Sequence, residues 1–129
     1  MTPRLALSGA AILMAAAVAL GAFGAHALKA RVTPDALAVW QTAVNYHAWH
    51  ALGLLGVGVL LSQFPHARGL ARVAWLFVAG IALFSGSLYA LALGAPAAVG
   101  IFTPFGGIAF IAGWLALALA VRALTASDP

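Results

Sequence analysis

VAWLFVAGIALFSGSLYALALGAPAAVGIFTPFGGIAFIAGWLALALAV, the stretch from Val73 to Val121, has 49 residues and no charged side chain. A single α-helix of this length would be about 73 Å long, more than twice the roughly 30 Å thickness of a bilayer's hydrocarbon core. Gly94-Ala95-Pro96 and Thr103-Pro104 interrupt the stretch with residues that favour turns and helix starts. The stretch therefore predicts two membrane-spanning helices, with Thr103 as the N-cap of the second.

The charged residues divide the rest of the 129-residue chain into two further apolar stretches, each long enough for one span. Only 6% of the residues are charged, against about 25% in a soluble domain, and 65% are hydrophobic. This composition excludes soluble, disordered, coiled-coil and nucleic-acid-binding proteins. We expect one all-α domain over residues 1–129, an integral membrane four-helix bundle. Its predicted spans are Leu5–Leu28, Ala43–Gln63, Val73–Leu93 and Pro104–Val121.

The basic residues predict the orientation of the bundle. Four spans place both chain ends and the middle loop on one side, together with Arg4, Arg68, Arg72 and Arg122. Lys29 and Arg31 belong to the other side. The positive-inside rule then predicts a multi-pass protein of the bacterial inner membrane with both termini in the cytoplasm. The first apolar run is longer than the 7–15 residues of a signal-peptide core, so we expect it to be retained as a helix.

Polar side chains within the predicted spans gather toward the outer surface. Counted from the predicted helix ends, residues 45–50 lie about 3–10 Å below that surface and residues 85–89 about 6–12 Å below it. A conduit for polar solutes needs polar lining through its whole depth, so this distribution favours an outward-facing pocket with a closed inner end. The candidate residues are His26, Asn45, Tyr46, His50, Ser85, Ser87, Tyr89 and Thr103.

The same side chains have an alternative role, which is to form hydrogen bonds between helices. The sequence offers little for catalysis or for a cofactor. It has no cysteine and no glutamate, and its two acids, Asp35 and Asp128, lie outside the spans. His47 and His50 are spaced to share a metal, but no acid lies near their depth. We therefore expect no enzyme, no metal and no cofactor, with a haem or metal protein as a minor alternative.

Glycine and serine recur at helical spacing and predict close helix contacts. Gly80, Ser87 and Gly94 are seven residues apart, which places them along one face of a helix. Small residues on such a face let two backbones approach closely in a bilayer. The interpretation is packing within the bundle, with a ligand groove or an interface between copies as alternatives.

Four segments of the chain resemble the signature segments of domain-of-unknown-function family 423. The segments are Gly21-Ala22-Phe23-Gly24-Ala25-His26, residues 42–50 (TAVNYHAWH), residues 83–89 (LFSGSLY), and Thr103-Pro104-Phe105-Gly106-Gly107 through Gly113-Trp114. The family includes bacterial inner-membrane proteins and eukaryotic proteins similar to transmembrane protein 256. The resemblance implies a small four-helix membrane protein without an assigned activity. His26 and His50 match the motif positions, whereas His47 departs from them, since related chains often carry glutamine there.

These observations predict a non-enzymatic accessory or binding protein that presents its polar pocket to a lipid headgroup, a small molecule or a partner helix. A small transporter or channel subunit acting as an oligomer is the alternative. The expected partners are membrane lipids and either a second copy of the chain or another membrane protein, and not nucleic acid.

Overall fold

The computed structural model describes residues 1–125 of the chain, and this part consists of helices joined by short loops. Four helical segments are long and apolar enough to cross a membrane: Pro3–Leu28, Pro34–Gln63, Arg68–Ala92 and Ala97–Leu124. The prediction of an all-α, four-span architecture is confirmed. In order, the elements are α1 (Pro3–Phe23), a π-helical turn (Gly24–Leu28), α2 (Pro34–Gln63), α3 (Arg68–Gly80), a second π-helical turn (Ile81–Ser85), α4 (Gly86–Ala92), a 3₁₀ turn (Ala97–Ile101) and α5 (Phe102–Thr125).

Two helices begin at a Thr-Pro pair. The hydroxyl of Thr2 accepts from the backbone N–H of Leu5 at 3.2 Å, and that of Thr33 accepts from Ala36 at 3.2 Å. Proline follows each threonine at the first helical position, where its missing N–H has no partner to lose. The cap at Thr33 starts α2 at Pro34, well before the predicted start at Ala43.

The predicted N-cap at Thr103 is wrong. The 3₁₀ turn of residues 97–101 passes directly into α5 at Phe102, so Thr103 already lies inside the first helical turn. Its hydroxyl instead lies 2.7 Å from the hydroxyl of Ser87.

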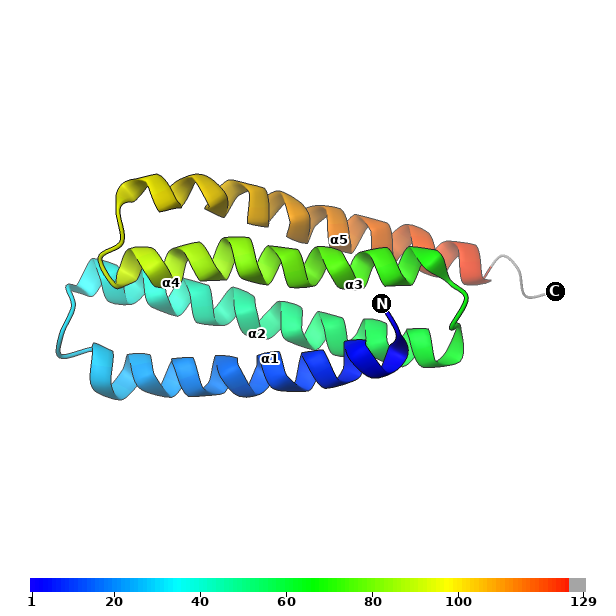
Figure 1. Ribbon diagram of the computed structural model, residues 1–129, viewed down its shortest axis with the longest axis horizontal. Coiled ribbons are helices and arrows are strands. Elements are labelled where there is room, and N and C mark those ends of the chain that lie inside the picture. The colour runs from blue at the N-terminus through cyan, green and yellow to red at the C-terminus, as the bar shows by residue number, and fades with distance from the viewer. Residues whose placement is uncertain (126–129) are drawn as a thin grey trace.

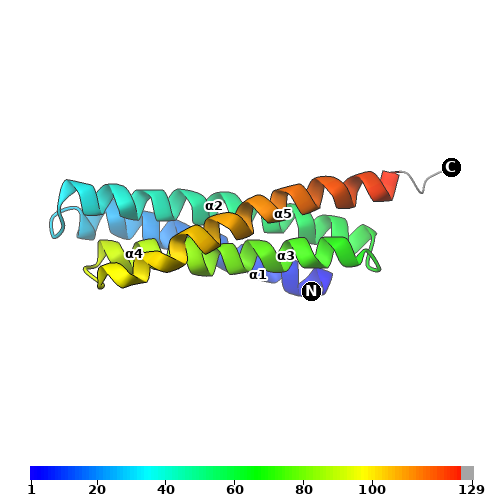
Figure 2. The same cartoon turned by 90° about the horizontal axis from the view of Figure 1, so that it is seen from above.

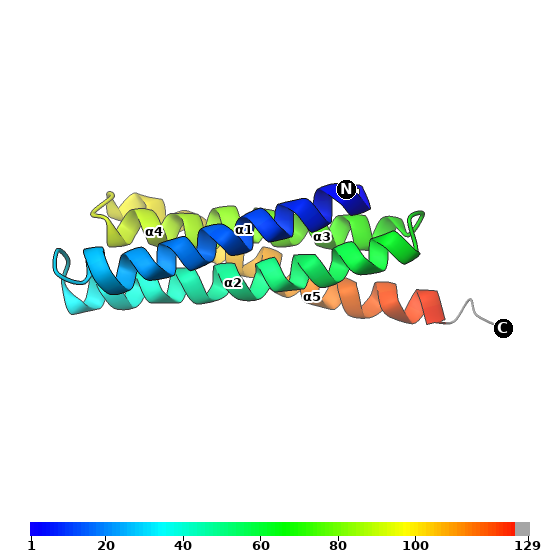
Figure 3. The same cartoon turned by 90° about the horizontal axis from the view of Figure 1, so that it is seen from below.

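Each span runs antiparallel to the span that precedes it in the chain (Figure 1). α1 packs on α2, and α2 also packs on α3 and α4. α3 and α4 in turn pack on α5. α5 runs obliquely to α3 and α4 (Figure 2), and α1 runs obliquely to α2 (Figure 3). The start of α1, the loop between α2 and α3 and the end of α5 lie together at one end of the bundle (Figure 1). That end carries Arg4, Arg68, Arg72 and Arg122.

Phenylalanines inserted over glycines hold α5 against the third span. A Cβ on Gly80 would overlap the ring of Phe110, and one on Gly113 would lie 2.7 Å from the ring of Phe77. A Cβ on Gly106 would overlap the backbone of Phe84. These positions therefore admit only glycine at the observed helix separation.

The predicted seam of small residues is correct at Gly80 and wrong at Gly94. Gly94 has a φ of +92° and follows the end of α4, where it turns the chain. It is a helix-ending residue because only glycine adopts this conformation at no steric cost.

Candidate functional site

His50 lies at the centre of an aromatic cluster between α2, α3 and α5. Its ring stacks on Phe110 with centroids 3.4 Å apart and planes 11° from parallel, and it meets Phe77 edge-on. Trp114 Nε1–H donates to His50 Nε2 at 3.1 Å, and His50 Nδ1 lies 2.7 Å from the carbonyl oxygen of Tyr46. Only 5% of the side chain is exposed.

These two hydrogen bonds fix the protonation of His50. A carbonyl oxygen only accepts, so Nδ1 carries the proton, and an indole N–H only donates, so Nε2 holds a lone pair. The imidazole is therefore the neutral Nδ1–H tautomer with both nitrogens engaged. In this arrangement it has no lone pair for a metal or a substrate proton.

His47, three residues before His50 on α2, contacts α4. Its Nδ1 lies 3.2 Å from the hydroxyl of Tyr89 on α4, and its Nε2 is buried without a hydrogen-bond partner in residues 1–125. Tyr89 in turn packs on Trp40, with ring centroids 4.7 Å apart. The indole of Trp40 covers Gly24 and donates to the carbonyl oxygen of Leu20 at 2.9 Å, which ties α2 to the π-helical end of the first span.

The serines of the third span have two different surroundings. Ser87 Oγ–H donates to the carbonyl oxygen of Phe84 at 2.9 Å, and Ser87 Oγ lies 2.7 Å from Thr103 Oγ1. Thr103 is the donor in this second bond if Ser87 has used its proton on Phe84, and the bond joins α4 to α5. Ser85 is fully buried, and its hydroxyl has no hydrogen-bond partner within the described chain.

Two predicted residues lie apart from the others. His26 is exposed in the π-helical turn at the end of the first span. Asn45 is exposed on α2, where its Oδ1 accepts from Gln41 Nε2 at 3.0 Å. The structure places the other predicted residues in separate contacts between helices: Tyr46 with His50, Ser87 with Thr103, and Tyr89 with His47. Ser85 is buried apart from these contacts, and His26 and Asn45 lie on the outside.

His50 lies close to the middle of α2, which begins at Pro34 and has 30 residues. The depth predicted from the sequence was counted from Ala43, and it stays a prediction.

A groove of about 400 Å³ runs between α2 and α5 beside His50. Trp49, Ile111 and Trp114 are 55%, 64% and 46% exposed, so the groove opens sideways on the face where lipid would lie. Neither the hydroxyl of Tyr46 nor the indole N–H of Trp49 makes a hydrogen bond to another residue of the described chain. We call this the aromatic groove; its lining residues are Tyr46, Trp49, His50, Phe84, Gly107, Phe110, Ile111 and Trp114.

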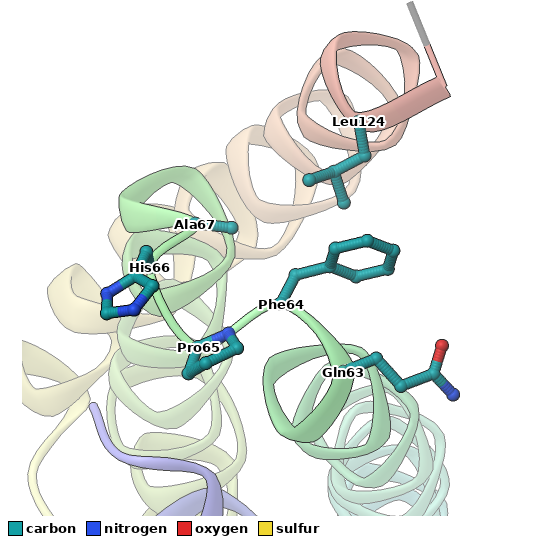
Figure 4. Close-up of a pocket in the computed structure, with 6 residues that line it drawn as sticks. All are labelled: Gln63, Phe64, Pro65, His66, Ala67 and Leu124. Carbon is teal, nitrogen blue, oxygen red and sulfur yellow. The ribbon is translucent and has the colours of Figure 1, made fainter. Parts of the chain in front are cut away.

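A second cleft of about 400 Å³ lies at the arginine-bearing end, between the loop after α2 and the end of α5. Figure 4 shows Phe64 and Leu124 pointing toward one another across it, while the side chains of Gln63 and His66 point away. The cleft is apolar and lies far along the bundle from the hydrogen-bonded residues around His50.

The sequence missed two partners of the predicted residues. The residues predicted from the sequence did not include Trp114, whose N–H bonds to His50. They did not include Phe110 either, whose ring stacks on His50. The presence of Gly113-Trp114 in one span and His50 in another is the feature of the sequence that could have indicated this contact. No group of three His, Cys, Asp or Glu side chains in residues 1–125 is placed to hold a metal ion.

Comparison with known proteins gives a consistent set of relatives. A family model described as "Protein of unknown function (DUF423)" matches residues 20–107. The chain is 45% identical to the UPF0382 membrane protein YwdK of Bacillus subtilis over 81% of this chain and 85% of that protein. It is 42% identical to the UPF0382 inner membrane protein YgdD of Escherichia coli K12 over 95% of this chain and 93% of that protein. No solved structure matches the chain.

Proposed function

The chain belongs to the DUF423 family of membrane proteins, and from that premise we propose that it is a non-enzymatic accessory protein that binds a lipid-soluble ligand in the aromatic groove. The observation that carries the proposal is the groove itself, which is open to the side of the bundle at mid-depth and walled by aromatic rings. Such walls suit an apolar chain or ring that enters from the bilayer.

The polar atoms of the groove narrow the ligand class. Tyr46 and Trp49 present an O–H and an N–H that no other residue of the described chain uses, and no charged side chain lines the groove. These groups favour a ligand with a neutral hydrogen-bond acceptor such as an ester or ring carbonyl. Both an acyl lipid and an isoprenoid quinone have this chemistry.

The state of His50 supports binding without catalysis. Both of its ring nitrogens are hydrogen-bonded, to Tyr46 and Trp114, so in this proposal His50 contributes only the flat surface of its ring to the wall of the groove. A general base needs a nitrogen within reach of a substrate proton, and no carboxylate lies among the lining residues.

Photolabelling tests the proposal directly. The purified chain is placed in vesicles of phosphatidylethanolamine and phosphatidylglycerol that contain a phosphatidylethanolamine with a diazirine in its acyl chain. We expect peptides around Tyr46 and Ile111 to carry most of the label. A photoreactive isoprenoid quinone in the same vesicles separates the two ligand sources.

Gly107→Leu supplies the groove-filling variant. A Cβ on Gly107 meets Phe84 at an ordinary 3.8 Å, so the backbone tolerates it and the rest of the side chain occupies the groove. Gly9→Leu is the matched control, since Gly9 lines a different groove and has open space around it. Labelling that is spread evenly over the bundle, or unchanged by Gly107→Leu, contradicts the proposal. Solute flux through the vesicles would instead support the transporter or channel alternative.

A further inference from the structure

Exposed residues of α2 form one continuous line along the helix. We call it the α2 stripe, and its members are Asn45, Trp49, Leu52, Gly56, Val59 and Gln63. The steps between them alternate between four and three residues, which is the spacing of a helix face that packs against another helix in a coiled coil. None of these residues is charged.

The amide at the outer part of this stripe is out of place on a lipid-facing surface. α2 has 30 residues and is about 45 Å long, so if it is centred in a hydrocarbon core of roughly 30 Å, Asn45 lies about 9 Å below the surface. Its one hydrogen bond within the described chain is to Gln41, whose side chain is also exposed. Between them the two amides keep unpaired donors and acceptors, which hydrocarbon does not satisfy.

The middle of the stripe is shaped for close approach. A Cβ added to Gly56 would meet nothing within 4 Å, and Leu52 and Val59 on either side are 55% and 46% exposed. A glycine between two exposed aliphatic side chains lets a second helix approach closely, so that both side chains pack against it.

We propose that two copies of this chain associate in the membrane through their α2 stripes, as a parallel pair about a two-fold axis normal to the bilayer. All copies inserted by one route have the same orientation, so the stripe of one copy meets the same stripe of the other at equal depth. Asn45 then faces Asn45, and because an amide has both donor and acceptor, the pair satisfies itself. The absence of charge along the stripe suits a second copy, since like charges facing each other would repel.

Cysteine crosslinking tests this arrangement in the full chain, which has no cysteine of its own. Single substitutions Leu52→Cys, Gly56→Cys and Val59→Cys are oxidised in native membrane vesicles. Ile12→Cys and Val18→Cys on α1 serve as matched controls, because these residues are 69% and 66% exposed away from the stripe. We expect disulfide-linked dimers at the stripe positions and monomers at the control positions.

Further variants identify the contact. Asn45→Leu should lower crosslinking of Val59→Cys, and Asn45→Gln should restore it, whereas Gly9→Leu, in the separate groove beside α1, should leave it unchanged. Fluorescence-detected gel filtration in mild detergent shows that each variant is folded. Equal crosslinking at α1 and α2, no crosslinking at any stripe position, or a product whose mass includes another protein would each overturn the proposal.

Discussion

Gly106→Ala tests the helix contact on which the bundle depends. A Cβ at this position would overlap the backbone N of Phe84 and lie 2.7 Å from its Cα. Backbone atoms cannot turn aside as a side chain can, so α5 has to move away from the π-helical turn of the third span. The movement also lengthens the Ser87–Thr103 hydrogen bond, one turn along α5.

The expected loss of stability follows from these contacts. Adding a methyl group to a well-packed interior costs about 1–3 kcal/mol, and we expect the upper end because the obstacle is backbone. At about 1.4 kcal/mol for each tenfold change, a loss of about 3 kcal/mol lowers the folding equilibrium constant by roughly two orders of magnitude.

The neighbouring residue supplies the control. Gly107→Ala makes the same chemical change one position away, where the Cβ meets the ring of Phe84 at 3.8 Å. Reversible unfolding in mixed detergent, followed by tryptophan fluorescence, measures both variants. Trp114 packs on Phe77 at the same interface and reports its separation. If Gly106→Ala unfolds at the same detergent fraction as Gly107→Ala, the close approach of α5 to the π-helical turn at Phe84 is wrong.

Three other outcomes follow. Trp114→Phe should destabilise the bundle by about 1 kcal/mol because it removes the bond to His50; Trp75→Phe, at a 53% exposed residue without that bond, should change the same unfolding curve little. A double-mutant cycle of Ser87→Ala and Thr103→Val should give a coupling of about 0.6 kcal/mol, and additive effects would show that their 2.7 Å contact is not stabilising. A reporter enzyme fused after α5 should be active in the cytoplasm, as the arginine-bearing end predicts, and periplasmic activity would reverse the orientation.

Charge and length were enough to predict the four spans, because a bilayer leaves a chain few alternatives. The uncharged run from Val73 to Val121 had to turn back, and it does so near Gly94. Helix starts were harder to predict. The three Thr-Pro pairs look alike in sequence, yet Thr2 and Thr33 cap helices while Thr103 lies within one, since the 3₁₀ turn before it had no distinct signal.

Contacts across helices could not be predicted from one sequence. The apolar stretch alone does not show that α2 begins at Pro34, which puts His50 close to the middle of that helix. The partner of His50, Trp114, lies 64 residues away along the chain. Asn45 and Tyr46 are adjacent in sequence and about 100° apart around α2, yet Asn45 is exposed and Tyr46 lies in the aromatic cluster. Helix rotation decides between these positions, and it is set by packing with the other helices.

The π-helical turn at Ile81–Ser85 divides the third span into two parts with a fixed phase relation. Below it, Phe77 faces α5 and His50; above it, Tyr89 faces His47 and Ser87 faces α5. A π-helical turn contains one more residue than an α-helical turn. Deleting a single residue there would leave an ordinary α-helical turn and keep the two parts in phase, whereas inserting one more residue would rotate the upper part by about 100° against the lower part. A relative that lacks one residue at this point would therefore keep the same contacts on both sides of the turn, with a continuous α-helix in place of the π-helical turn.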